Sequence, residues 1–152
     1  KKAKNILLWR TNDINKIESK VANGGNWILL IKSATNVLKG DKYVLVSPDL
    51  FENKFIVRKG DVITSSILGK SDLNLKSINF KIKSLLRETR DEIKLKGSQV
   101  SEINTSRNFV RKIRDFLKDN QNTKFKLEVV SLRDSKTAEP IVVEIVISKI
   151  ES

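Results

Sequence analysis

The chain of 152 residues contains no cysteine, no histidine and no methionine. Without cysteine it can form no disulfide and offers no thiolate nucleophile, and without cysteine and histidine it has no Cys/His zinc site. The absence of histidine also excludes imidazole, the commonest general base near neutral pH. These absences favour a protein that is not an enzyme and needs no cofactor and no metal.

Two further absences bear on where the protein works. The chain begins at Lys1 and lacks an initiator methionine, so we expect a fragment or processed product of a longer parent, with any signal or membrane segment outside it. No apolar run approaches the ~18 residues that a membrane span needs. A lack of cysteine is permissive for an extracytoplasmic location.

Positive charge is in excess, with 30 basic residues against 18 acidic ones and a net charge of +12. Such a surface attracts nucleic acid, anionic lipid or an acidic protein. The excess is spread evenly, because residues 1–75 and residues 76–152 each carry six more basic than acidic residues. A diffusely basic, solvated surface is therefore the simpler interpretation.

The stretch 104–120 has the clearest helical pattern. Its apolar residues recur at i, i+1, i+4, i+7 and i+8 and form one stripe, namely Phe109, Val110, Ile113, Phe116 and Leu117. Side-chain oxygens at Asn104, Thr105 and Ser106 are suited to cap its start, and Asn120 is suited to end it.

Alternating apolar and polar residues on both sides of this helix predict strands, at 78–83 and 93–97 before it and at 125–129 and 141–147 after it. The predicted fold class is α+β: a ferredoxin-like antiparallel sheet in β-β-α-β-β order, with one covering helix. The expected core joins the helix stripe to one face of the sheet, made of Ile82, Ile93, Leu95, Leu127, Ile145 and Ile147.

Two helices and a β-hairpin insert are expected before this sheet. Apolar spacing predicts helices over residues 1–22 and 27–38. Runs at 43–46 and 54–57 predict the hairpin, 62–64 a further strand and 65–75 a mobile connection. The predicted division is therefore 1–40, 41–77 and 78–152, packed as one unit.

The strongest polar pattern is basic. Arg107, Arg111, Arg114 and Lys118 are spaced i, i+4, i+7 and i+11 along one line of the predicted helix, and Lys81, Lys83, Lys94 and Lys96 occupy outward positions of the predicted strands. A sheet that binds RNA presents exposed aromatic rings between its lysines. Phe80 instead falls in register with the apolar face, which favours a basic face that only keeps the sheet soluble.

From about residue 78 onward the chain resembles the extracytoplasmic domain of the PilN family and its relatives of the PulL type in type II secretion. The residues that carry the resemblance are Glu92-Ile93-Lys94-Leu95-Lys96-Gly97-Ser98, similar to the family's I-x-L-x-G strand and turn. The helix over 106–117 and a β-hairpin ending at 141–147 follow. In the family, the helix before the sheet runs almost directly into the first strand, whereas here residues 41–77 intervene.

The resemblance implies a non-enzymatic scaffold domain of an envelope-associated pilus or secretion assembly, on the extracytoplasmic side of a membrane-anchored parent. Its expected partner is a second copy or a related assembly domain, bound through an edge of the 78–150 region or through the N-terminal helix. The alternative is a basic module, cytoplasmic in that case, whose 104–120 stripe binds nucleic acid or another anionic partner such as anionic lipid.

Overall fold

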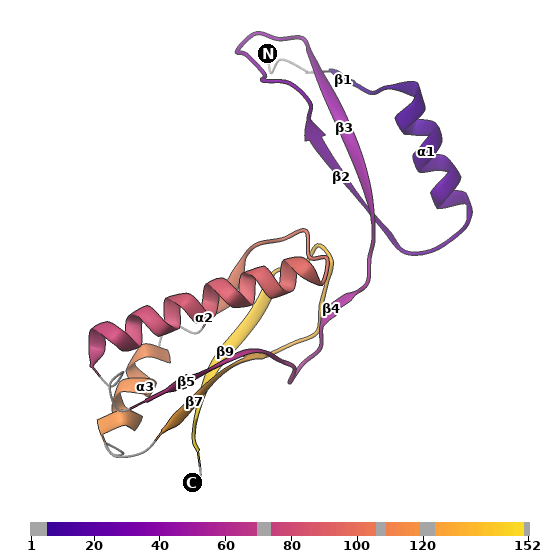
Figure 1. Cartoon of the computed structure of the whole chain (residues 1–152). Helices are drawn as coiled ribbons and strands as arrows, with labels where there is room; N and C mark the ends of the chain where they lie inside the picture. Colours follow the sequence, from indigo (N-terminus) through magenta and orange to yellow (C-terminus); the bar gives the residue numbers. More distant parts are fainter. Residues whose placement is uncertain (1–5, 70–73, 106–108, 119–123, 151–152) are drawn as a thin grey trace. The chain divides into compact units, whose positions relative to one another are not determined.

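The structure is a computed structural model that describes residues 6–69, 74–105, 109–118 and 124–150. The side chains of five helical residues lie outside the description: Leu75, Val110, Arg114, Leu117 and Lys118. The chain divides into two compact units, Lys1–Lys54 and Phe55–Ser152, which we call the N-terminal and C-terminal units (Figure 1).

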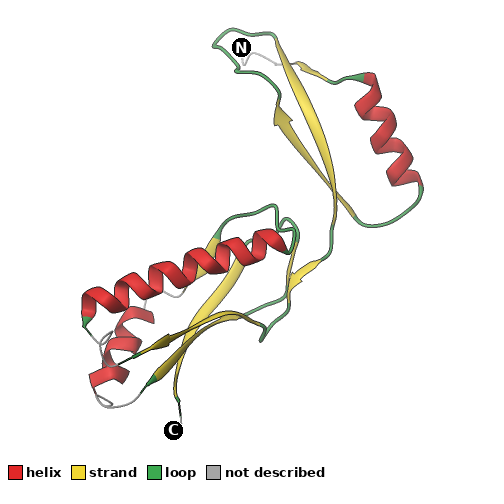
Figure 2. Ribbon diagram, viewed as in Figure 1, coloured by secondary structure: helices red, strands yellow, loops and turns green. Residues whose placement is uncertain are grey.

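The N-terminal unit combines a small sheet with one helix (Figure 2). Its elements are β1 (Ile6–Leu8), α1 (Thr11–Ala22), β2 (Trp27–Ser33) and β3 (Tyr43–Glu52). The strand order is β1-β3-β2. β2 runs antiparallel to β3 from the pair Trp27↔Glu52 to the pair Ser33↔Val46, and β1 runs parallel to the start of β3.

The structure confirms the helix predicted over 1–22 only for Thr11–Ala22, because Ile6–Leu8 form β1, and it contradicts the helix predicted over 27–38. Residues 27–31 are a continuous apolar run, Trp-Ile-Leu-Leu-Ile, which fits a strand as well as a buried helix. The strand forms because this run pairs along its whole length with β3. The predicted hairpin of 43–46 with 54–57 is also wrong, because β3 extends to Glu52 and pairs with β2 instead.

The C-terminal unit is built around a mixed sheet. Its elements are β4 (Phe55–Val57), β5 (Val62–Leu68), α2 (Leu75–Leu95), β6 (Ile103–Thr105), α3 (Phe109–Lys118), β7 (Phe125–Ser131), β8 (Ser135–Lys136) and β9 (Ile141–Lys149). The strand order is β5-β7-β9-β6, with β6 parallel to β9 and the other neighbours antiparallel. β4 pairs with β8 beside this sheet. The α+β class is therefore confirmed.

The strands predicted at 78–83 and 93–97 are wrong, because both stretches belong to the single helix α2. Its buried residues follow each other at i, i+4, i+7, i+11 and i+15, a helical stripe, and are Ile78, Ile82, Leu85, Thr89 and Ile93. The alternation that indicated a strand depended on Phe80, which lies on the exposed side of the helix. The β-β-α-β-β order therefore does not describe the elements of this unit.

Both ends of α2 carry the sequence signals of a helix. At its start the side chain of Asn74 accepts a hydrogen bond from the Ser77 N–H at 2.8 Å. At its end Gly97 has φ +100°, the Ser98 N–H donates to the Ile93 carbonyl at 3.0 Å, and the Gly97 N–H donates to the Lys94 carbonyl at 2.9 Å. These bonds are the Schellman arrangement that ends helices at glycine. Gly97 therefore closes a helix and does not follow a strand.

The core of the C-terminal unit joins both helices to one face of the sheet. Phe125, Leu127 and Val129 alternate along β7 with half-buried residues. α2 packs against β5 and β7, and α3 packs against β9. Ile113 of α3 is buried in the same cluster as Ile82, Ile93, Leu127 and Ile145, as predicted.

Other predicted core residues differ from the expectation. Leu95 is 84% exposed because it lies on the outward side of the last turn of α2. Phe109, Phe116 and Ile147 are only partly buried against the core, and Phe116 meets the Phe125 ring edge to face at 5.6 Å between centroids. The predicted contact of Leu117 lies outside the described side chains.

The remaining differences concern element ends. Asn104 and Thr105 belong to β6 and do not cap α3, while Ser106 and Asn120 lie outside the described residues. The strand predicted at 62–64 is confirmed but continues to Leu68, so only part of the predicted 65–75 connection is left. Residues 70–73 of that connection lie outside the description.

Candidate interaction surfaces

The predicted basic stripe on α3 is only partly within the described side chains. Arg107 lies outside the described residues, and the side chains of Arg114 and Lys118 lie outside the description. Arg111 is exposed and faces the Asp115 carboxylate one turn later at 3.8 Å. Its neighbour Lys112 pairs with Glu144 at 3.2 Å. The described part of this helix therefore pairs its cations with carboxylates of the same unit.

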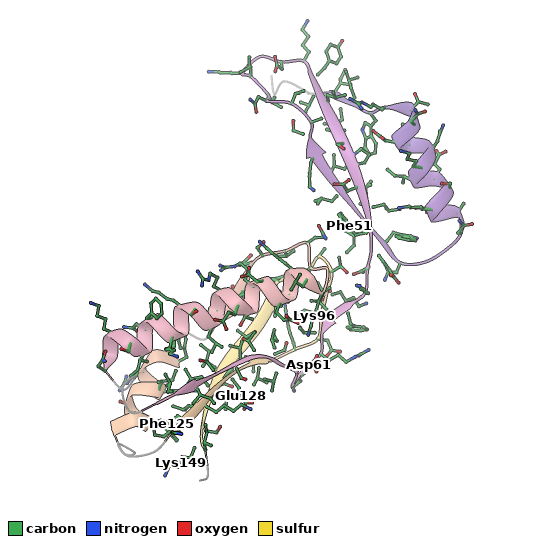
Figure 3. The ribbon with its side chains drawn as sticks, in the orientation of Figure 1. Phe51, Asp61, Lys96, Phe125, Glu128 and Lys149 are labelled. Carbon is green, nitrogen blue, oxygen red and sulfur yellow. The ribbon has the colours of Figure 1, made fainter. Side chains whose placement is uncertain are left out.

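The other four predicted cations change their setting completely, because they lie on α2 and not on strands. Lys83 and Lys94 are eleven residues apart, which is about three helical turns, so they share one side of the helix. Lys81 is half-buried on the flank of α2, and Lys96 is its C-cap residue (Figure 3). The structure therefore brings Lys83 and Lys94 together and separates Lys81 and Lys96 from them.

The outward side of α2 also carries residues that the sequence analysis did not connect with these lysines. Lys76, Phe80, Lys83 and Arg87 follow each other at i, i+4, i+7 and i+11, which places them along one line. The Phe80 side chain is 72% exposed. Open hollows lie on both sides of it, lined by Lys76, Ser77 and Lys81 and by Lys83, Ser84 and Arg87. Their helical spacing is the feature of the sequence from which this surface could have been predicted.

The N-terminal unit presents a second surface, which is apolar. Val46, at 4% exposure, is its only buried hydrophobic residue among those described. Large hydrophobic side chains are exposed on each of its strands and on α1, namely Ile6, Leu7, Leu8, Ile14, Val21, Leu29, Ile31 and Tyr43, with Val37 and Leu38 in the connection between β2 and β3. This unit therefore leaves many of its large apolar side chains exposed to water.

The helix of this unit covers its sheet incompletely. α1 buries none of its residues. An open groove of about 330 Å³ lies between α1 and β3, and Ile17, Pro48, Leu50 and Phe51 contribute to its walls. Strand β2 does not close this groove, since its residues Leu29 and Ile31 are each 42% exposed.

Strand β2 also offers an open backbone edge. In the described sheet it lies at one end of the order β1-β3-β2 and pairs only with β3. The Asn53 N–H donates to the Asn26 carbonyl at 2.7 Å, and the Ala34 N–H donates to the Leu45 carbonyl at 2.8 Å. Because antiparallel ladders alternate, the even-numbered residues of β2 bond to β3 and the N–H and C=O groups of Leu29 and Ile31 point to the open edge.

A third cluster of cations surrounds Phe55 of β4. The Arg58 guanidinium lies 4.2 Å from the ring centroid and the Lys136 ammonium 5.2 Å from it. Arg58 also lies 3.9 Å from Asp134, whose other oxygen accepts the Lys59 N–H at 2.8 Å. These contacts hold β4 and the β8 turn together, so the cluster has a structural role.

The described residues contain no cluster of side chains typical of a metal site. No group of three or more acidic, histidine or cysteine side chains is close enough in this part of the chain to hold a metal ion. The hydroxyl of the buried Thr89 bonds to the hydroxyl of the half-buried Thr64 at 2.6 Å, and Thr89 also donates to the Leu85 carbonyl at 2.7 Å. No helix within the described ranges has both the length and the apolar content of a membrane span.

Comparisons of the chain with protein-family models, with curated proteins and with solved structures find no match. The residues that carry the PilN resemblance, Glu92 to Ser98, form the last turn of α2 and its glycine cap. The strand and turn on which that resemblance depended are therefore a helix end. The candidate surfaces are consequently defined by their own geometry.

Proposed function

We propose that the chain is a non-enzymatic interaction module that joins a second copy of itself through the β2 edge of its N-terminal unit. The observation that supports this most directly is the contrast within that unit, which exposes its apolar side chains and buries only Val46 among the described hydrophobic residues. Burial of apolar surface is the main driving force of association as well as of folding. A strand that is open, long and apolar is a favoured place for such an association.

The sequence of β2 suits pairing with itself. Leu29 and Ile31 are placed symmetrically about Leu30. Antiparallel pairing of two copies centred on Leu30 sets Leu29 of one copy opposite Ile31 of the other, with their free N–H and C=O groups facing each other. Pairing centred on Leu30 therefore satisfies the free backbone groups of β2 and also places its apolar side chains next to each other.

The same pairing extends an apolar stripe across both copies. Leu29 lies opposite Leu50, and Ile31 lies opposite Pro48, in the β2–β3 ladder. These four residues are on one face of the sheet because directly opposed residues share a face. Lys32, the cation of β2, is held by Asp49 at 3.1 Å. The shared seam is therefore apolar at its centre.

The other long open edge, β5, is less suited to this role. The middle of β5 is polar, Thr64-Ser65-Ser66. Within the described sheet, no strand pairs with its free side. At the opposite edge, β6 spans Ile103–Thr105 only. We therefore propose β2 as the partner surface in place of the 78–150 edge or the N-terminal helix, and of the two expected partners, a second copy or a related assembly domain, we propose the second copy.

The placement of this module in an extracytoplasmic pilus or secretion assembly stays a prediction. The strand predicted at 93–97 no longer supports this placement, because that stretch is helical. The self-association proposal does not depend on it. Sequencing the parent gene would test the placement, since a membrane-anchored parent requires an apolar segment of ~20 residues outside this chain.

The experiment is a concentration series of the full chain in analytical ultracentrifugation. We expect a monomer–dimer equilibrium in the micromolar range. Leu29→Lys places a charge at the seam and should give a monomer at all concentrations. Val37→Lys adds the same charge to an exposed hydrophobic position outside the sheet and should leave the equilibrium unchanged.

A second variant separates edge pairing from general stickiness. Leu29→Pro removes an N–H that points to the open edge and none that bonds to β3, so it should also give a monomer while the unit stays folded. A wild-type chain that remains monomeric at millimolar concentration would reject the proposal. Dimers that persist in both Leu29 variants would place the interface elsewhere and reject the β2 edge.

A further inference from the structure

The outward side of α2 combines an exposed aromatic ring with unpaired cations. Phe80 lies one turn after Lys76, three residues before Lys83 and seven before Arg87. These four residues span about 16 Å along the helix axis. Lys94 extends the same side by about two further turns. A ring set between cations at this spacing has the two elements that bind single-stranded nucleic acid.

The cations of this surface are available to a ligand. Within the described residues no carboxylate pairs with Lys76, Lys83 or Arg87, whereas cations elsewhere in the chain do pair, such as Lys112 with Glu144 and Lys126 with Glu128. Even on α2, the guanidinium of Arg90 donates to the Ser101 carbonyl at 3.1 Å and so has a structural role. The charges of the outward line therefore form no ion pair within the described fold.

Phe80 has no role in the core. α2 buries the opposite side, with Ile78, Ile82 and Ile93 in the hydrophobic cluster. No aromatic ring and no cation within the described part of the chain stacks on Phe80. The open hollows on both sides of Phe80 leave room for a planar group against it.

We infer that this surface, defined by Lys76, Phe80, Lys83 and Arg87, binds single-stranded nucleic acid. A base stacks on the Phe80 ring, and the phosphates on either side of that base pair with Lys76, Lys83 and Arg87. Stacking on an aromatic ring tolerates any base, since every base has a π face. The surface therefore binds with little sequence preference, and an unstructured RNA or DNA strand is its ligand.

An anionic membrane surface is the main competing ligand class, and the geometry disfavours it. A helix that lies on a membrane inserts a broad apolar face. The apolar face of α2 is already buried in the protein core, and Phe80 is the one apolar side chain among the four residues of the surface. A single ring between cations matches a base between phosphates better than it matches an acyl layer.

The test titrates the full chain into a fluorescein-labelled uridine 12-mer at several salt concentrations. Each phosphate contact contributes about −0.7 to the slope of log affinity against log salt for a single strand. The three cations therefore give a slope of about −2. The double variant Lys83→Glu/Arg87→Glu should abolish measurable binding, and Phe80→Ala should weaken it roughly fivefold or more.

Matched controls keep the net charge and the loss of apolar area constant. Lys124→Glu/Lys149→Glu changes the net charge by the same amount at the far end of the β7–β9 pair, where both side chains are exposed. Leu95→Ala removes an exposed apolar side chain from the same helix. Both controls should retain wild-type affinity for the 12-mer.

Four results would overturn the inference. Equal loss of binding in both double variants would mean that diffuse charge alone attracts the strand. Unchanged binding in Phe80→Ala, or equal affinity for a duplex of the same length, would exclude base stacking. Binding to vesicles of phosphatidylserine and phosphatidylcholine without binding to the 12-mer would assign the surface to membranes. Because α2 and β2 are separate surfaces, Leu29→Lys should retain the wild-type affinity for the 12-mer even if the proposed dimer fails.

Discussion

The two units of this chain are built from the same kinds of element but differ in what those elements bury. In the C-terminal unit, fifteen of the described hydrophobic residues form one buried cluster. In the N-terminal unit, Val46 is the one described hydrophobic residue that is buried. Helix α2 buries a stripe along its whole length, whereas α1 buries no residue. Paired strands and a neighbouring helix are therefore not sufficient to make a core.

The physical reason lies in how apolar residues are distributed over the strands. Along β7, buried residues alternate strictly with half-buried ones, so one face needs covering. Along β2, residues 27–31 are all apolar, so both faces of a narrow sheet carry apolar side chains. One helix can cover only one of those faces. The apolar side chains that stay exposed on β2 are the reason why we propose that a second copy pairs with its edge.

We expect the largest loss of stability from truncating a buried aromatic side chain of the C-terminal unit. Phe125 of β7 is fully buried and its ring meets Phe116 of α3, so Phe125→Ala should lower the free energy of unfolding of the C-terminal unit by about 3–5 kcal/mol. In the N-terminal unit, Leu29→Ala in the monomer should cost less than about 0.5 kcal/mol, because the side chain is exposed.

The two units can be followed separately in one urea titration. Both tryptophans, Trp9 and Trp27, lie in the N-terminal unit, so tryptophan fluorescence reports that unit alone. The far-ultraviolet circular dichroism signal comes mainly from α2 and α3 of the C-terminal unit, with a smaller part from α1. Phe125→Ala should move the dichroism midpoint and leave the fluorescence midpoint in place. If both midpoints move together, the units unfold as one and the comparison fails.

An intermediate effect is expected at the glycine that ends α2. Gly97 has φ +100°, a region that is costly for residues with a side chain. Gly97→Ala should therefore destabilise the C-terminal unit by about 1 kcal/mol, measured by the same dichroism titration. Gly97→Asn should cost less, since asparagine tolerates the left-handed region. Equal costs for both substitutions would contradict a glycine-specific cap at this position.

The smallest effect is expected at Phe80, even though it is the same residue type as Phe125. Phe80→Ala should change the free energy of unfolding by no more than about 0.5 kcal/mol, because the ring is exposed on the outward side of α2. A loss of several kcal/mol would mean that the ring is buried. That result would restore the strand predicted at 78–83 and remove the proposed nucleic-acid surface.

Part of this fold could be predicted from the sequence because some patterns have only one interpretation. The alternation in β7 and β9 and the apolar stripe of α3 are of this kind. The stretch 78–83 has two interpretations, since Ile78 and Ile82 are apolar at both the strand and the helix period. Phe80 fits the two-residue period of a strand. The buried Leu85, Thr89 and Ile93, however, continue only the helical period.

The candidate surfaces were predictable to a smaller extent. Lys83 and Lys94 were identified as outward cations, but their common side with Phe80 follows only when the stretch is a helix. The β2 edge was not predicted, because the spacing over 27–38 favoured a helix and a helix has no open edge. Which strand lies at the edge of a sheet depends on pairing between distant segments, and a local pattern does not contain that information.

The pairing of β5 has a consequence for the order in which the chain acquires its structure. Leu68 at the end of β5 is paired with Phe125, 57 residues further along the chain. During synthesis the ribosome therefore releases β5, α2, β6 and α3 before the first partner of β5 exists. Contacts that close such long loops slow folding, while helices and hairpins form early. α2 and the β2–β3 hairpin are thus available as nuclei, and the nascent chain must keep β5 from pairing elsewhere until β7 emerges.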